Sequence, residues 1–244
     1  MNYEADLSEP IDISIPLVHQ AAGPKCFGAP NVDISPVVVD DWVGSTAAGS
    51  PVNFYNVQLN PHGNGTHTEC VGHISKKAVH LSDVLKHSLC TAQLVTVTPT
   101  NSSDGDRVIT EKLLRAVSLT DGVAAIIIRT NPNDDSKLTR DYTGTNPPYL
   151  TKEAVEYILS TGVDHLLLDL PSIDREADGG QLVGHKTFWS YPATIDKKKT
   201  VTEMVYVNNS VPDGLYLCDI QTINIELDAS PSRPILYKLT ASEA

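Results

Sequence analysis

The chain has 244 residues, with 18 Lys and Arg against 30 Asp and Glu, a net charge of −12 and 41% hydrophobic residues. This composition is typical of a soluble globular protein, and its length allows one large domain or two small ones. The acidic balance argues against nucleic acid, because phosphate binding needs clustered Lys and Arg. No apolar stretch approaches the ~20 residues of a membrane span, and no signal peptide is visible, so we expect a cytoplasmic protein without membrane contact.

Short β-branched runs predict strands along most of the chain, at residues 37–39, 54–59, 94–97, 125–128, 166–168, 215–218 and 223–227. Many of these runs lack polar alternation, which is typical of strands buried on both faces. Helices are predicted at 110–117 and 151–159, where Thr110 and Thr151 can cap an amphipathic segment. Alternating strands and helices in the middle, with strand-rich flanks, predict an α/β fold with a mixed sheet and flanking helices.

Candidate chemistry is concentrated in residues 60–73, which hold His62, His67, Glu69 and His73. Imidazole and carboxylate groups are the common ligands of Zn or Mn, and catalytic sites of this kind leave one coordination position open for water. Composition alone leaves another interpretation open, in which this is a polar loop whose histidines only form hydrogen bonds. The four cysteines show no C-x-x-C spacing, so we expect reduced and mostly structural thiols.

Strand periodicity separates the members of this segment. Residues two apart point to the same side of an extended chain, so His67 and Glu69 share a face. His73 joins them if the chain stays extended. Cys70 points the other way, and we expect it to be a small core residue.

His62 lies five positions before His67 and would face away from it in a regular strand. It needs a bulge or tight bend to join the other candidates. Gly63 and Gly65 can provide one, because glycine reaches positive φ without steric cost. His62 is therefore a weaker candidate ligand than His67.

At these residues the chain resembles the metal-dependent cyclase family of hydrolases, which includes bacterial arylformamidases (kynurenine formamidases) and isatin hydrolases. The family signature is H-x-G-T-H-x-D-x-P-x-H, and residues 65–69 with His73 match most of it. Two positions depart from it. Glu69 replaces the family's Asp, and Gly63 stands where the family has its first histidine, with His62 one step earlier.

The resemblance covers roughly residues 50–240. Residues 169–174 are similar to the family's D-x-x-S-x-D segment, His185 follows where a later ligand is expected, and Glu203 occupies the place of a late glutamate ligand. The resemblance implies metal-ligand roles for His67, Glu69, His185 and Glu203, with His62 as a displaced candidate, and a general acid/base role for His73.

What the resemblance implies for the whole chain is a single domain of the swivelling β/β/α type over residues 1–244, with a variable segment at 1–52. It further implies a divalent ion, Zn or Mn, and a homodimer or higher homo-oligomer. The implied activity is hydrolysis of a small amide by metal-activated water, arylformamidase-like, with an N-formyl arylamine of tryptophan catabolism or a cyclic amide as substrate.

The departures leave alternatives open. Glu in place of Asp moves the carboxylate outward by about 1.5 Å, whereas metal–oxygen distances tolerate only a few tenths of an ångström. The chain could hold one metal where relatives hold two, or be a non-catalytic binding or assembly member of the family. Hydrolysis of a lactone or imide, or ring closure by dehydration, is a further alternative. A serine-hydrolase mechanism has no support, because no G-x-S-x-G motif is present.

Overall fold

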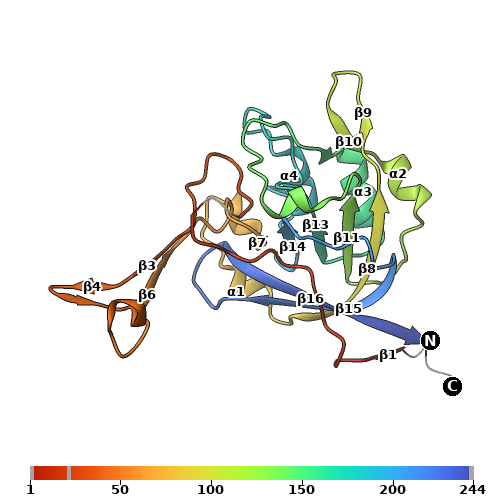
Figure 1. Cartoon of the computed structure of the whole chain (residues 1–244). Helices are drawn as coiled ribbons and strands as arrows, with labels where there is room; N and C mark the ends of the chain where they lie inside the picture. The colour runs from red at the N-terminus through yellow and green to blue at the C-terminus, as the bar shows by residue number, and fades with distance from the viewer. Residues whose placement is uncertain (1–2, 21–22, 242–244) are drawn as a thin grey trace.

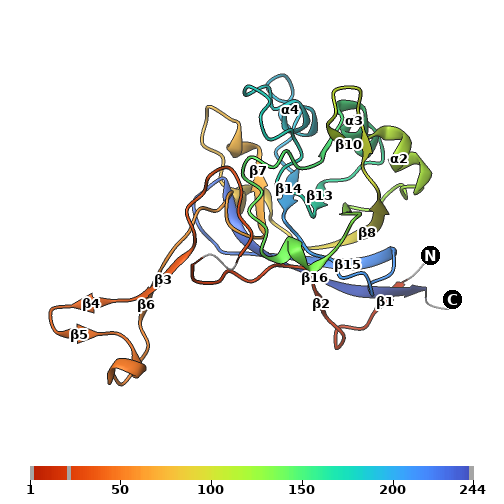
Figure 2. The ribbon, with the colours of Figure 1, turned by 45° about the horizontal axis from the view of Figure 1, so that its top comes forward.

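The computed structural model describes residues 3–20 and 23–241. Within these ranges the main sheet has nine strands: β1 (Tyr3–Ala5), β2 (Ile11–Asp12), β7 (His67–Cys70), β8 (Leu89–Val97), β11 (Ala125–Thr130), β13 (His165–Leu168), β14 (Thr200–Glu203), β15 (Gly214–Thr222) and β16 (Ala229–Ala241). The order β16-β15-β8-β11-β13-β14-β7 closes on itself, because β7 also pairs with the start of β16. Seven strands therefore form a closed ring, to which β1 and β2 add at β16 (Figures 1 and 2).

The ring is a mixed sheet. Strands β8, β11, β13 and β14 are parallel neighbours, whereas β7, β15 and β16 pair antiparallel. The helices are α1 (Leu81–Val84), α2 (Glu111–Ala116), α3 (Lys152–Ser160) and α4 (Val183–Phe188), with 3₁₀ turns η1 (Thr46–Ala48), η2 (Val71–His73) and η3 (Asp135–Leu138). Helices α2, α3 and α4 lie together on one side of the ring (Figure 1). The predicted α/β fold with a mixed sheet and flanking helices is confirmed.

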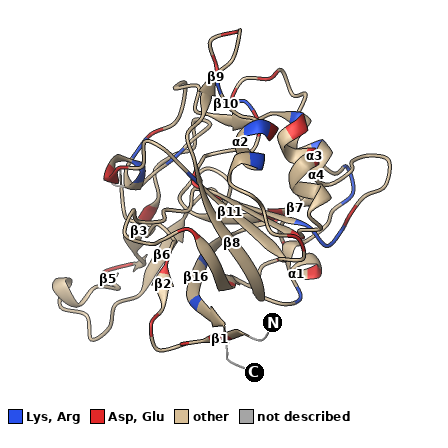
Figure 3. Ribbon diagram, turned by 90° about the vertical axis from the view of Figure 1, so that its right-hand side faces the viewer, with Lys and Arg blue, Asp and Glu red and all other residues tan. Residues whose placement is uncertain are grey.

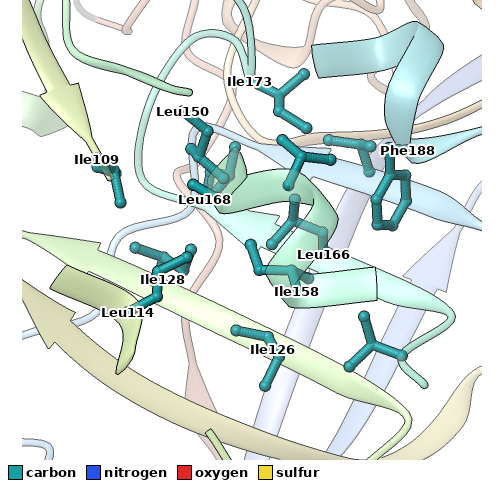
Figure 4. Close-up of a cluster of buried hydrophobic side chains, with 14 of the residues drawn as sticks. Ile109, Leu114, Ile126, Ile128, Leu150, Ile158, Leu166, Leu168, Ile173 and Phe188 are labelled. Atoms are coloured by element: carbon teal, nitrogen blue, oxygen red, sulfur yellow. The ribbon is translucent and has the colours of Figure 1, made fainter. Parts of the chain in front are cut away.

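Two hydrophobic cores follow from the two faces of the central strands. All six residues of β11 are buried. Ile126 and Ile128 belong to the core between the sheet and the helices, which includes Ile158 of α3 (Figure 4). Ala125 and Ile127 belong to the second core, inside the ring. The uninterrupted apolar run of β11 therefore serves both faces, as expected of a strand buried on both sides.

The two predicted helices are present and begin at the predicted caps. The Thr110 side chain accepts a hydrogen bond from the Leu113 amide at the start of α2, and that of Thr151 accepts one from the Ala154 amide at the start of α3. Each bond satisfies an amide that the first helical turn leaves free. No helix within the described ranges is long and apolar enough to cross a membrane.

The predicted strand at 223–227 is wrong. Strand β15 ends at Thr222, which pairs with Ser232, and β16 then leaves β15 and pairs with β7 through Ala229–Pro231. The segment between them has an alternating pattern, but no strand in the described part of the chain pairs with it, so it forms the connection across this switch. Helix α4, which carries His185, was not predicted, because its six residues are too few to show a helical period.

The remaining strands lie outside the ring. A small sheet contains β9 (Thr100–Asn101), β10 (Arg107–Ile109) and β12 (Tyr149–Leu150). Two ribbons, β3 (Asp33–Pro36) with β6 (Tyr55–Gln58) and β4 (Val38–Val39) with β5 (Trp42–Val43), form an arm that projects away from the ring (Figures 1 and 2). Lys and Arg are spread over several elements instead of gathering on one (Figure 3).

Candidate metal centre

Adjacent strands β7 and β14 bring the first three candidates together. His67 lies directly opposite Glu203 in the antiparallel register, and Glu69 lies opposite Val201. Residues that lie opposite each other share a face of the sheet, so His67, Glu69 and Glu203 point to the same side as Val201. Val201 belongs to the hydrophobic core between the sheet and the helices. The predicted shared face of His67 and Glu69 is therefore the face that α4 covers.

Helix α4 adds His185 above these strands. Its Nε2 lies 2.9 Å from Glu69 Oε1 and 3.8 Å from Glu203 Oε1. Its Nδ1 donates to Asp174 Oδ2 over 2.6 Å, and the amide of His185 donates to the same oxygen. Asp174 therefore fixes the ring so that Nε2 faces the carboxylates of the strands.

His67 has a free nitrogen inside the cluster. Its Nδ1 lies 3.1 Å from the carbonyl oxygen of Gly65, a contact in which Nδ1 donates and Nε2 keeps its lone pair. Nε2 lies 3.4 Å from Glu203 Oε2. Within the described ranges this fully buried atom has no hydrogen-bond partner. Buried polar atoms are rarely left unpaired, so the Nε2 position fits a ligand atom whose partner is an ion.

His62 reaches the same centre from a turn. The Asn60 side chain accepts hydrogen bonds from the amides of His62 and Gly63, which tightens the turn. A Cβ at Gly63 would lie 2.3 Å from the Cβ of Ala29, so only glycine fits there. Gly65 has φ +64°, in the left-handed region. The bend that His62 was expected to need is therefore present at these two glycines.

Both ring nitrogens of His62 contact carboxylates. Nδ1 lies 2.9 Å from Glu69 Oε2, and Nε2 lies 2.7 Å from Asp228 Oδ2. His73 lies beside them, with its Nδ1 3.6 Å from Glu69 Oε2 and 3.8 Å from Asp228 Oδ2. The chain is extended only as far as Cys70, and the 3₁₀ turn η2 begins at Val71. His73 therefore reaches the centre from this turn and not from an extended strand.

Cys70 is excluded from the centre. It is fully buried, and its thiol contacts the carbonyl oxygen of Val79 on the other side of β7. Burial raises the pKa of this thiol to about 11. The expectation of a core cysteine agrees with this placement.

Carboxylates control the protonation of the two most strongly perturbed histidines. Burial alone would lower the pKa of His62, but hydrogen bonds to Asp228 and Glu69 outweigh it and raise the pKa to about 10. Burial acts likewise on His185, where the charge of Glu69 and the hydrogen bond to Asp174 raise the pKa to about 10. Burial opposes the charge of Glu69, but the neighbouring histidines hold its pKa well below the usual range.

The cluster contains two groups of three residues that could each hold a metal ion. One is His67, Glu69 and Glu203, and the other is His62, Glu69 and His73; in each, the candidate ligand atoms lie within 4.8 Å of one another. Glu69 belongs to both groups. The arrangement therefore accommodates one ion, or two ions that share the Glu69 carboxylate.

Sequence reasoning missed the roles of two acidic residues. In the sequence, Asp174 is only the last residue of the segment that is similar to the family's D-x-x-S-x-D motif. Nothing in that motif indicates that Asp174 orients His185. Asp228 follows the segment that was wrongly predicted as a strand, and it reaches His62 from 166 positions away in the chain. Only the closure of β16 onto β7 brings it there, and no local signal encodes that closure.

A cavity of about 390 Å³ opens beside the cluster. His62, Glu69, His73, His185 and Glu203 all line it. Phe27 and Leu182 are among its apolar lining residues. Its size lies within the range of small-molecule pockets.

Solved structures with the same fold cover nearly the whole chain. A potential metal-dependent hydrolase with cyclase activity has a TM-score of 0.67 and 15% identity, covering 94% of this chain and 97% of its own. A predicted metal-dependent hydrolase from Bacillus stearothermophilus has a TM-score of 0.66 and 17% identity, covering 94% and 98%. Isatin hydrolase A from Labrenzia aggregata has a TM-score of 0.67 and 13% identity, covering 94% and 93%. At these identities the likeness establishes the fold.

A search of curated protein sequences found no match. A family model described as putative cyclase matches residues 5–175, which include β7 and the segment that ends at Asp174. This match covers more than half of the chain. The chain therefore belongs to the putative cyclase family.

Proposed function

We propose that this protein is a metal-dependent hydrolase that cleaves a small amide, either an N-formyl arylamine, as an arylformamidase does, or a cyclic amide. The observation that carries the proposal is the buried Nε2 of His67, which has no hydrogen-bond partner among the described residues and lies beside the carboxylates of Glu69 and Glu203. The imidazole of His185 contacts the same Glu69 carboxylate. Membership of the putative cyclase family supports it. So do structural neighbours described as metal-dependent hydrolases and isatin hydrolases.

The proposed ligands are His67, Glu69, His185 and Glu203, with His62 at a second position that shares Glu69. Imidazole nitrogens and carboxylate oxygens without thiolate are a donor set suited to Zn or Mn. A divalent ion held there would lower the pKa of water and polarise the carbonyl of the substrate.

Three contacts hold the proposed ligands in place before any ion binds. The Gly65 carbonyl fixes the ring of His67, Asp174 fixes that of His185, and the Ile173 amide donates to Glu203 Oε1 over 2.9 Å. Partners of this kind orient ligands and set their tautomers. The chain therefore presents its candidate ligands in a fixed arrangement.

His73 is the proposed general acid/base. Its side chain is partly exposed and lines the cavity, whereas those of His67 and His185 are buried. An imidazole ring can donate a proton at one nitrogen and accept one at the other, which suits a histidine to proton transfer to and from a substrate. Its place in one of the two metal-capable groups gives His73 an alternative role as a ligand.

The experiment is elemental analysis of protein purified without chelator, with His67→Ala and Glu69→Ala as site variants. His165→Ala is the matched control, because His165 is a partly buried histidine that contacts Thr200 away from the cluster. We expect bound Zn or Mn in the wild type and the control and little in the site variants. Absence of a bound transition metal in the wild type, or full retention in both site variants, would contradict the proposal.

Substrate class needs a separate assay. We would measure turnover of a formyl anilide, an isatin-like cyclic amide and a lactone by the metal-loaded protein, with His73→Ala beside the wild type. We expect amide turnover that His73→Ala reduces while metal content is retained. Turnover of the lactone alone would replace the amide by an ester substrate, and a metal-loaded protein without any turnover would favour the non-catalytic alternative.

A further inference from the structure

Two of the four cysteines lie on neighbouring strands of the ring. Cys90 is the second residue of β8, and Cys218 lies in the middle of β15. These strands run side by side in antiparallel direction (Figures 1 and 2), and in their register Cys218 lies directly opposite Cys90. Two thiols that are far apart in the sequence therefore meet across a strand pair, which no local pattern indicates.

The hydrogen bonds between β8 and β15 set the spacing of the two backbones. The amide of Ile220 donates to the carbonyl oxygen of Ser88 over 2.9 Å, two positions along from each cysteine. Hydrogen-bonded and non-hydrogen-bonded pairs alternate along antiparallel strands, so Cys90 and Cys218 also form a hydrogen-bonded pair. The Cα atoms of such a pair are about 5.5 Å apart, which lies within the range of roughly 4.4–6.8 Å that disulfides span.

The two thiols differ in their access to solvent. Cys218 is fully buried in the core inside the ring, whereas Cys90 packs against the same core and is only partly buried. Hydrogen bonding to the Cys90 thiol and burial raise the pKa of the Cys218 thiol well above its usual range. Because the thiolate is the reactive form of cysteine, Cys218 is protected from direct oxidation.

The other two cysteines have different neighbours. Cys70 lies opposite Thr200 in the register of β7 and β14, and its thiol contacts the carbonyl oxygen of Val79. The Cys26 thiol contacts the carbonyl oxygen of His62. Both are buried, so the partly exposed Cys90 is the thiol that an oxidant in solution reaches most easily.

We propose that Cys90 and Cys218 form a reversible oxidation site, at which hydrogen peroxide converts the two thiols to a disulfide between β8 and β15. The peroxide transfers a hydroxyl group to the Cys90 sulfur, which gives a sulfenic acid and one water molecule. The Cys218 sulfur then attacks the Cys90 sulfur. The S–S bond forms, the S–O bond breaks, and the hydroxyl group leaves with the Cys218 proton as a second water molecule. Two thiols are oxidised and one peroxide is reduced.

The spacing of the side chains explains why the bond should be reversible. The Cβ atoms of directly opposite residues lie about 4.5–5.5 Å apart, whereas those of a disulfide lie about 3.5–4.5 Å apart. Closing the bond therefore draws Cys90 and Cys218 together by up to about 1 Å. Disulfides that depart from their preferred geometry are more easily reduced, so a thiol reductant should restore both cysteines. The oxidation site does not depend on the proposed hydrolase activity, because its readout is the state of the thiols.

The test counts free thiols before and after the folded protein is treated with hydrogen peroxide. Chelator-treated protein is used, so that a bound metal takes no part, and the thiols are titrated in denaturant after the peroxide is removed. We expect the wild type to lose two of its four thiols and to regain both with dithiothreitol. The matched control Cys70→Ala should also lose two, whereas Cys90→Ala and Cys218→Ala should form no disulfide within the chain. Cys26→Ala is a second control, and near-ultraviolet circular dichroism checks that each protein is folded before and after oxidation.

Peptide mapping by mass spectrometry identifies the bond. We expect the peptides that contain Cys90 and Cys218 to be joined in the oxidised wild type. A wild type that keeps all four thiols, a disulfide that involves Cys26 or Cys70, or a bond between two chains would overturn the proposal. So would a disulfide that forms only after the protein has lost its near-ultraviolet signal, because the strand register would then not be its cause.

A trapping experiment tests the order of the two steps. Cys218→Ala lacks the thiol that attacks the sulfenic acid, so this intermediate should accumulate at Cys90. Dimedone, which reacts with sulfenic acids, should label Cys90 of Cys218→Ala at least about fivefold more than it labels the wild type. In Cys90→Ala the buried Cys218 should remain a thiol at the same peroxide concentration. Labelling of Cys218 in that variant equal to the labelling of Cys90 in Cys218→Ala would overturn the assignment of Cys90 as the thiol that meets the peroxide.

Discussion

Asp174 acts on the candidate metal centre through His185. Its carboxylate receives both the ring Nδ1 and the amide of His185 and thereby sets the direction of Nε2. Asp174→Asn keeps the shape but removes the charge that favours this orientation. We expect metal affinity to fall about 10–100-fold while the protein stays folded.

Competition with a chromogenic chelator measures this change. Asp121→Asn is the control, because Asp121 is exposed and lies outside the candidate centre. An affinity for metal that is unchanged in Asp174→Asn would contradict the positioning role.

Proton release gives a second test at the candidate centre. In the metal-free protein the pKa values of His62 and His185 are raised to about 10, so both rings are protonated at neutral pH. A metal ligand must be neutral, so binding should release between about one and two protons, and affinity should increase as pH rises toward 10. Isothermal titration in buffers of different ionisation enthalpy counts the protons.

The stability of the metal-free protein changes with pH in the opposite direction to its metal affinity. Because the folded-state pKa values are raised, the ion pairs of these histidines stabilise the metal-free protein fully below pH ~6.5, and this contribution is lost as pH rises through about 10. In the isothermal titration, a heat of metal binding that does not depend on the buffer would mean that the rings of His62 and His185 are already neutral before the metal binds.

Strands and helices that are marked by a pattern within a few neighbouring residues could be predicted from the sequence. Features that depend on the pairing of strands far apart in the chain could not. The β11 strand and the capped helix α3 show apolar runs and a Thr cap within a few residues, and both are present near the predicted bounds. His67 and Glu69 share a face because strand parity is a local rule. The closing pair of β7 and β16 joins residues about 160 positions apart, so the placement of Asp228 had no local signature.

Helix α4 tolerates little extra volume at its first turn. A Cβ at Gly184 would lie 2.9 Å from Asp174 Oδ1 and 3.1 Å from Ile173 Cγ1. Gly184→Ala must therefore shift α4 or the Asp174 carboxylate, and His185 shifts with either. We expect a loss of about 1–3 kcal/mol in the free energy of unfolding, together with weaker metal binding.

Chemical denaturation and chelator competition measure the two effects of Gly184→Ala. Val183→Ala serves as the control, because Val183 lies on the exposed side of the same helix turn and the substitution adds no volume. Wild-type stability and metal affinity in Gly184→Ala would show that α4 is free to move.

The closed ring brings together the residues of the candidate centre, which are far apart in the sequence. Its residues come from a turn, two strands, a short helix and the connection before β16, which span positions 62 to 228. The net charge of −12 is spread over the surface, but Glu69 and Glu203 are buried with histidines, where they concentrate negative charge. A divalent cation there would oppose the repulsion between these carboxylates and add a further link between elements that already meet through strand pairing and the hydrogen bonds of the site.

This linkage predicts that metal stabilises the whole fold. An ion that binds only the folded chain adds about 2.7 kcal/mol at a free concentration of 100 times its dissociation constant. For a chain of this length that gain corresponds to a rise in Tm of roughly 5–10 °C. Differential scanning calorimetry of the chelator-treated protein, with and without added Zn or Mn, should show this rise in the wild type and in His165→Ala but not in His67→Ala. An equal rise in His67→Ala would mean that the ion binds elsewhere, because that variant lacks the buried side-chain nitrogen that has no hydrogen-bond partner in the described part of the chain.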